Sequence, residues 1–264
     1  MNIFLREVKT NFKSLLIWGV IVTLFTTMGI AKFSGYAENP ELLAVLDNMP
    51  PALLATFSMN AFNLTTITGF LGVMIAFYAL LLSIAAAMWG SDIISKEERD
   101  KTVEFSLTLP VPRGKLVTAK ALAAVVNCIG LLVISYVFTL YSAQQYNPDS
   151  EFYNFLNLSM VVLFIMQMVF LAVGLLLGCA MKRHKRANSA AVSILLGTYF
   201  LSIVSDMSED FEFLKYFSPF KYFNFVDVLN ESKIEIASVW LSMGIIAVAL
   251  AGAYISYSKR DLYI

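Results

Sequence analysis

The sequence predicts an all-α integral membrane protein with six transmembrane helices. Of its 264 residues, 58% are hydrophobic and only 14% are charged, whereas soluble domains are about 45–50% apolar. The apolar residues gather in six runs, each close to the roughly 20 residues that a helix needs to cross a bilayer. We therefore expect residues 1–264 to form a single transmembrane domain.

A short basic helix is expected before the first span. Residues 1–14 contain two helical faces, one with Ile3, Phe4, Val8 and Phe12 and one with Arg6, Lys9 and Lys13. This pattern is typical of a helix that lies in the membrane interface. Residues 15–31 are uncharged and form span 1. No small-residue cleavage site follows this run, which favours a retained span over a signal peptide.

The other five apolar runs predict spans 2 to 6 at residues 65–89, 116–141, 156–181, 187–204 and 236–257. Cys128 and Cys179 lie inside these runs and are interpreted as small hydrophobic residues rather than as a disulfide. Lys120, one turn inside span 3, can extend its amino group to the surface. No span has Asp or Glu in its interior, whereas ion-coupled carriers usually need an ionisable group near the midplane. The predicted spans therefore do not contain the acidic group that an ion-coupled carrier would use.

Basic residues are concentrated on one side of the predicted spans. With the N-terminus inside, fourteen of these residues fall in cytoplasmic segments and four outside, which predicts cytoplasmic termini under the positive-inside rule. The cytoplasmic set is Arg6, Lys9, Lys13, Lys96, Arg99, Lys101, Arg113, Lys115, Lys182, Arg183, Lys185, Arg186, Lys259 and Arg260. The external set is Lys32, Lys215, Lys221 and Lys233.

The external connection before span 6, at residues 206–235, combines acidic and aromatic side chains. Eight aromatic residues lie between Phe211 and Phe225. Aromatic side chains at this density favour the headgroup region, while the acidic groups cannot enter hydrocarbon. We expect this segment to lie at the outer interface and to be partly re-entrant.

The longest charged passage is the loop between spans 2 and 3, at residues 91–115. Ser95 to Glu98 form an S-x-x-E capping box that can start a helix, and Pro110 and Pro112 would end it after Leu109. We therefore expect a short helix at the cytoplasmic surface. From its residues alone, the loop could equally be a solvated connector.

The residues of this loop resemble a family pattern. They are Glu97, Thr102, Glu104, Phe105, Leu107, Leu109, Pro110, Val111, Arg113 and Lys120. The run is similar to the loop between spans 2 and 3 of ABC-2 type permeases, although Lys101 and Pro112 replace a common glycine and serine. In that family the loop is a coupling helix that docks on an ATPase subunit. The resemblance implies that the coupling residues here are Glu97, Glu98, Arg99, Asp100, Thr102, Glu104 and Arg113.

The resemblance also implies a function. The chain would be the permease subunit of an ATP-driven exporter, a multi-pass protein of a bacterial plasma membrane, with hydrophobic or amphipathic substrates such as peptides, drugs or lipids. Its expected partners are an ABC ATPase subunit, a second permease of the same or a similar kind, and the lipid membrane, but no nucleic acid. The chain lacks a Walker A motif, because Leu109 precedes Gly114-Lys115 where the first glycine belongs. We expect no enzyme activity and no cofactor here, with ATP and Mg²⁺ used by the partner.

Two other functions were weighed against this one. An intramembrane metalloprotease would use Glu97 and Glu98, but Thr102 occupies the arginine position of that motif and His184 is the only histidine. A channel or accessory membrane protein without an ATPase stays open, because resemblance of fold alone does not determine function. Three small-residue ladders allow close helix packing, most simply within one subunit: Gly174-x3-Gly178, Ser189-x3-Ser193-x3-Gly197 and Ala247-x3-Ala251.

Overall fold

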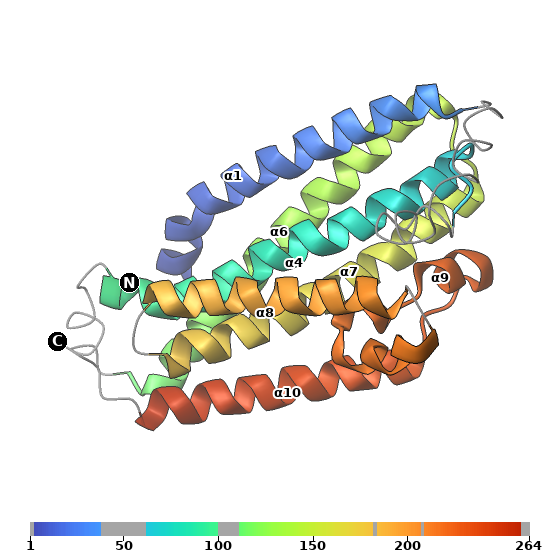
Figure 1. The fold of residues 1–264 in the computed structure, drawn as a ribbon. Coiled ribbons are helices and arrows are strands. Elements are labelled where there is room, and N and C mark those ends of the chain that lie inside the picture. Colours follow the sequence, from blue (N-terminus) through green and yellow to red (C-terminus); the bar gives the residue numbers. More distant parts are fainter. Residues whose placement is uncertain (1–2, 38–61, 100–110, 182–183, 207–208, 260–264) are drawn as a thin grey trace.

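The computed structural model describes residues 3–37, 62–99, 111–181, 184–206 and 209–259, which form an all-helical bundle (Figure 1). Among these residues, six helices are long and apolar enough to cross a membrane, which confirms the predicted fold class. They are α1 (Ile3–Ala31), α4 (Ile67–Arg99), α6 (Arg113–Ala143), α7 (Ser150–Ala180), α8 (His184–Ser205) and α10 (Ile236–Lys259).

Shorter elements connect these helices at one end of the bundle. Before α7, Asn147 adopts a left-handed conformation with φ 48°, and the Asp149 carboxylate accepts a hydrogen bond from the backbone N–H of Phe152 at 2.9 Å. Such a side-chain acceptor starts a helix by satisfying one of its free N–H groups. The short elements are η1 (Lys32–Gly35), η2 (Gln144–Tyr146), η3 (Glu209–Phe217), η4 (Pro219–Lys221) and α9 (Phe225–Glu231).

Helices α4 and α7 form the centre of the bundle. In their most apolar windows, 72% and 61% of the residues are buried, against 17–33% in the other four spans. Glycines let the two backbones approach closely: a Cβ added at Gly174 would lie 2.4 Å from the Ala87 carbonyl oxygen, and one at Gly178 would lie 2.6 Å from that of Ser91. The Gly174-x3-Gly178 ladder therefore packs within the subunit, as expected.

Different segments of the chain lie at the two ends of the bundle. We call the end at which α4 ends and α6 begins the α4–α6 end, and the opposite end, where residues 206–235 join α8 to α10, the α8–α10 end. Both ends of the described chain lie at the α4–α6 end (Figure 1). The topology thus agrees with the prediction that the termini and the loop between spans 2 and 3 share one side.

Two boundaries differ from the predicted ones. α1 runs without interruption from Ile3 to Ala31, so the expected interfacial helix and span 1 form one helix. α4 continues to Arg99 and contains Ser95, whose hydroxyl donates to the Ser91 carbonyl at 2.6 Å. Ser95 therefore does not start a new helix, and the predicted capping box is wrong. The rest of the expected surface helix, at residues 100–110, lies outside the described residues.

Candidate functional site

Four of the seven predicted coupling residues lie at the α4–α6 end. Glu97, Glu98 and Arg99 are the last three residues of α4, and Arg113 is the first residue of α6. The other three predicted residues, Asp100, Thr102 and Glu104, lie outside the described residues. The structure thus describes the end of α4 and the start of α6, which flank residues 100–110, together with their contacts to the rest of the bundle.

Arg113 ties the start of α6 to the end of α10. Its guanidinium donates to the backbone carbonyls of Tyr257 at 3.4 Å and Ser258 at 3.2 Å. These carbonyls belong to the last turn of α10, where acceptors lack partners within the helix and a cation is favourable. One turn further, Thr118 and Tyr254 share a hydrogen bond of 2.7 Å between their hydroxyl groups. Arg113 therefore holds the start of α6 against the end of α10.

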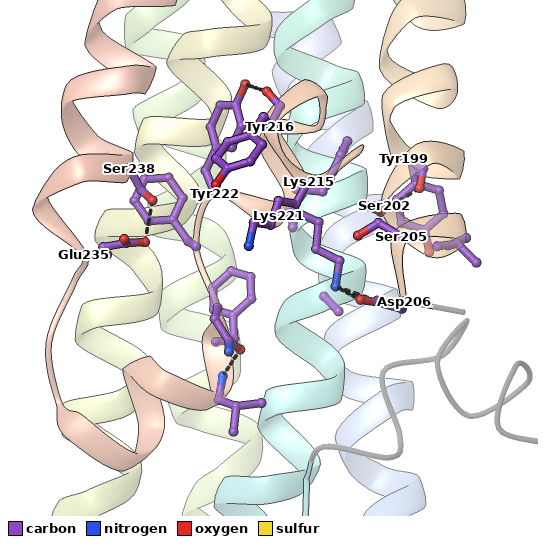
Figure 2. A pocket seen from close by; sticks show the side chains of 18 of the residues that line it. Tyr199, Ser202, Ser205, Asp206, Lys215, Tyr216, Lys221, Tyr222, Glu235 and Ser238 are labelled. Atoms are coloured by element: carbon purple, nitrogen blue, oxygen red, sulfur yellow. Dashed lines mark hydrogen bonds and ion pairs between the residues drawn. The ribbon is translucent and has the colours of Figure 1, made fainter. Parts of the chain in front are cut away.

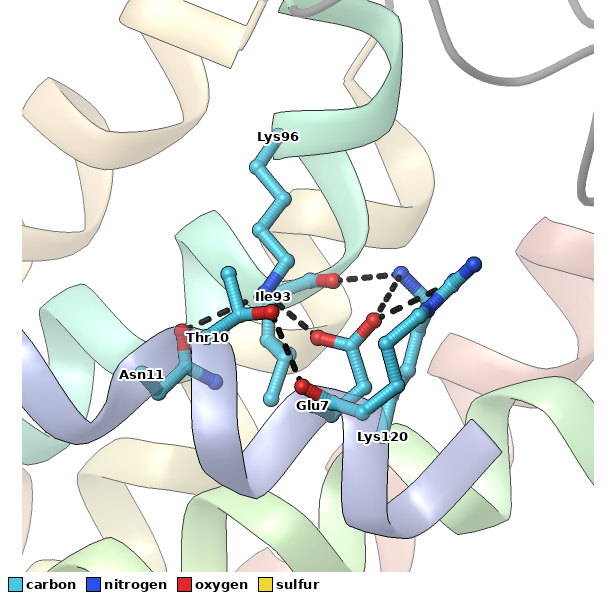
Figure 3. Close-up of polar contacts among 7 residues, drawn as sticks. Glu7, Thr10, Asn11, Ile93, Lys96 and Lys120 are labelled. Atoms are coloured by element: carbon cyan, nitrogen blue, oxygen red, sulfur yellow. Dashed lines mark hydrogen bonds and ion pairs between the residues drawn. The ribbon is translucent and has the colours of Figure 1, made fainter. Parts of the chain in front are cut away.

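A buried ion cluster anchors the other side of the segment. Glu7 from α1 forms an ion pair with Lys96 from α4, and its second carboxylate oxygen lies 3.7 Å from the Lys120 amino group of α6 (Figure 3). The residues are 2%, 6% and 0% exposed, respectively. We call Glu7, Lys96 and Lys120 the ion cluster. It joins three helices that are far apart in the sequence.

Neutral groups complete the bonding of this cluster. Lys120 donates to the Ile93 carbonyl at 2.8 Å, and Lys96 donates to the Asn11 side-chain oxygen at 3.2 Å (Figure 3). Arg6, which is partly exposed, also approaches Glu7 at 3.5 Å. Burying charges is costly unless they are paired and their remaining hydrogen-bonding capacity is satisfied. The cluster meets the first condition, since Glu7 pairs with lysines from two other helices, but the second only in part, because the Asn11 side-chain nitrogen is buried without a hydrogen-bond partner among the described residues and Glu7 Oε2 has only its ion pair with Lys96.

The structure corrects the interpretation of Lys120 and adds Glu7 to the site residues. Lys120 was expected to reach the surface, but it is fully buried because an acid and a carbonyl receive its amino group inside the bundle. Glu7 was not recognised as a site residue. A signal was present, since Phe4, Glu7, Val8 and Asn11 share one helical face, which places an acid on a largely apolar side of α1.

At the α8–α10 end, the segment between α8 and α10 folds back alongside α8 before it reaches α10. The Ser218 hydroxyl donates to the Thr198 carbonyl at 2.8 Å, about 10 Å along α8 from its last residue at about 1.5 Å per residue. The Phe220 ring lies between those of Phe170 and Tyr199, with centroid distances of 5.3 Å and 5.4 Å. This geometry fits a re-entrant segment; its position relative to a membrane stays a prediction.

The turned-back segment encloses a pocket of about 750 Å³ together with α4, α8 and α10. Four charged side chains line it, and Figure 2 shows Lys215 and Lys221 between Glu235 on one side and Asp206 on the other. Asp206 and Lys221 form an ion pair, and Glu235 accepts a hydrogen bond from Ser238 at 2.8 Å. Volumes of about 300–1,000 Å³ are typical of ligand sites. The pocket is thus large enough for a small amphiphile.

Aromatic side chains form much of the remaining pocket wall. The Tyr222 hydroxyl donates to the Tyr216 carbonyl at 2.9 Å, and burial raises the pKa of the Tyr222 phenol. The phenol therefore stays a neutral donor at physiological pH. Sequence reasoning recognised the aromatic density of this segment but not the pocket, because Glu235, Ser238 and the α4 wall join it only through the fold.

Comparison with known proteins agrees with this architecture. A family model described as ABC-2 family transporter protein matches residues 1–262, almost the whole chain. A search of curated proteins gives no match. The family model covers all six spanning helices, the ion cluster and the segment between α4 and α6. The chain therefore belongs to the ABC-2 transporter family.

Proposed function

We propose that this chain is the permease subunit of an ATP-driven exporter in a bacterial plasma membrane, and that a separate subunit hydrolyses ATP with Mg²⁺. The observation that supports this most is the family match over residues 1–262. A multi-pass transport component of this family works with an ABC ATPase. We further propose that the direction of transport is export and that the substrate is hydrophobic or amphipathic.

The segment between α4 and α6 is the proposed contact with the ATPase. Its flanks are anchored on one side by Lys96 in the ion cluster and on the other by Arg113 at the end of α10. A force applied to the segment would therefore reach α1, α6 and α10, because stiff helices and buried polar contacts transmit displacement. Glu97, Glu98, Arg99, Asp100, Thr102 and Glu104 are the proposed contact residues.

Charge reversal tests the contact with the ATPase. Glu97→Lys with Glu98→Lys should weaken co-purification of the ATPase and lower substrate-stimulated ATP hydrolysis and transport together, since charge-assisted contacts contribute about 1.5–3 kcal/mol each where desolvated. Reconstituted complexes are compared with the control reversal Glu38→Lys with Glu41→Lys. Wild-type behaviour of both pairs would favour the alternative, a channel or accessory protein with a solvated connector.

A second permease copy is the other proposed partner, and α8 is the proposed contact. The ladder Ser189-x3-Ser193-x3-Gly197 is exposed on α8, and a Cβ added at Gly197 would meet nothing within 4 Å. This ladder thus does not pack within the subunit, contrary to the simplest expectation. Exposed small residues let two helices approach closely in a membrane.

Cysteine cross-linking tests the dimer. If the ladder lies at the two-fold axis of the dimer, Ser193→Cys should give a cross-linked dimer in membranes, because residues at the axis of a symmetric interface meet their own copies. Ala247→Cys, in the exposed ladder of α10, serves as the matched position. Cross-linking at Ala247 but not at Ser193 would move the contact to α10, and a fully active monomer in nanodiscs would contradict the dimer.

A further inference from the structure

Two hollows of different character meet at one side chain of α10. The first is the charged pocket of about 750 Å³ described above, and the second is a groove of about 510 Å³ between α7 and α10. Leu241 lines both. The groove continues along α10 to Ala249, about 12 Å further at about 1.5 Å per residue. The two hollows therefore adjoin at Leu241, one of them polar and the other apolar.

The described residues that line the groove are all hydrophobic or glycine. From α7 come Val173 and Leu176, and from α10 come Trp240, Leu241, Gly244, Ile245, Val248 and Ala249. Gly244 leaves it open, since a Cβ added there would meet nothing within 4 Å. The groove lies within the apolar span of α10. Its surroundings in a membrane are hydrocarbon, so a flexible chain of CH₂ groups fits it and a polar ligand does not.

Among the described residues, the pocket lining carries two carboxylates and two amino groups. Asp206 and Glu235 provide the carboxylates, and Lys215 and Lys221 the amino groups (Figure 2). Lys215 lies 5.4 Å from the centre of the Tyr216 ring, while the carboxylate of Glu235 receives the Ser238 hydroxyl on the α10 side. Asp206 and Lys221 pair with each other, whereas Lys215 and Glu235 come from different walls of the pocket. This separation favours a ligand group that itself carries a cation and an anion.

We propose that pocket and groove together bind a zwitterionic phospholipid. The phosphate lies toward Lys215, the ammonium group toward Glu235, and one acyl chain in the groove below Leu241. The order agrees with a bilayer leaflet, because the charged hollow lies at the end of the helices and the apolar one toward their middle. This site lies at the opposite end from the coupling segment, so its occupancy does not depend on the proposed ATPase partner.

The substitution Gly244→Leu tests the acyl-chain part. A Cβ added at Gly244 meets nothing within 4 Å, so the leucine side chain starts in open space and should occupy the groove in place of a lipid tail with little effect on folding. Ala247→Leu is the matched control, since Ala247 is exposed on the same helix but does not line the groove. Native mass spectrometry of the purified protein, titrated with phosphatidylethanolamine, measures bound lipid. We expect one tightly held lipid in wild type and in Ala247→Leu, and its loss in Gly244→Leu.

The headgroup part is tested with two further ligands and one pocket variant. Phosphatidylglycerol, which lacks the ammonium group, and glycerophosphoethanolamine, which lacks the chains, should each bind more weakly by about tenfold or more. Lys215→Met with Glu235→Gln should remove the preference for phosphatidylethanolamine over phosphatidylglycerol. Equal retention of the two lipids by wild type, or equal lipid binding by Gly244→Leu and Ala247→Leu, would overturn the proposal.

Discussion

The ion cluster and the Asp206–Lys221 pair both join carboxylates to lysine amino groups, but the first is buried and the second is partly exposed. In the cluster the side chains of Glu7, Lys96 and Lys120 are 2%, 8% and 0% exposed, whereas those of Asp206 and Lys221 are 35% and 29% exposed. The cluster joins residues from three helices, while the pair joins residues 15 positions apart within one connection. Burial makes the first contact a structural requirement, and exposure leaves the second free to rearrange.

This difference agrees with the place of each contact in the proposed function. In the proposed function, the α4–α6 end transmits force from an ATPase, which requires that the ends of α1, α4 and α6 keep fixed positions relative to one another. The pocket at the α8–α10 end must admit and release a ligand, and a partly solvated ion pair can open at little cost. Three substitutions test this comparison, in order of decreasing expected effect.

The largest effect is expected for Glu7→Gln. The substitution removes the carboxylate that the buried Lys96 and Lys120 share, and removing one partner of a buried ion pair typically costs about 3–5 kcal/mol. The free energy of unfolding, measured in detergent by denaturant titration, should fall by this amount. The control is Asp206→Asn in the same assay. Equal small losses for the two variants would contradict the distinction between buried and exposed contacts.

A smaller loss is expected for Lys96→Met. Glu7 then keeps Lys120 as its partner, and the methionine side chain fills a similar volume, so the loss should be about 1–3 kcal/mol. The double variant Glu7→Gln with Lys96→Met measures the coupling between the two side chains, expected at about 0.5–3 kcal/mol by double-mutant cycle. Additive losses would show that the two residues act independently, against the geometry of the cluster.

The smallest effect is expected for Asp206→Asn. The exposed pair should contribute about 0–1 kcal/mol to stability, and salt should weaken this contribution further. Thermal unfolding at low and high salt measures both properties. Wild type and Asp206→Asn should become indistinguishable at high salt, while Glu7→Gln stays destabilised. A loss for Asp206→Asn that persists at high salt would indicate that this pair also has a buried structural role.

The six spans, their order and the shared side of the termini could be predicted from the sequence, because these depend on the length of apolar runs and the distribution of basic residues. A bilayer imposes both conditions on the chain locally, so periodicity and composition are enough. The end of a helix is harder to predict, because it depends on contacts beyond the apolar run. Span 2 is predicted to end near Trp89, and α4 continues past this point to Arg99. Lys96 is accepted inside the bundle because Glu7 receives its charge.

Tertiary structure alone decided which polar residues meet. Glu7, Lys96 and Lys120 are separated by 89 and 24 positions, and nothing in their local sequence pairs them. The pocket likewise needs α4 and α10 to stand beside residues 206–235, and its junction with the groove depends on the single position of Leu241. Hydrophobic periodicity determines which face of a helix is buried, but the partner across that face is set by packing among all the helices. The sequence by itself therefore determined the helices and their topology, and the tertiary structure decided the sites.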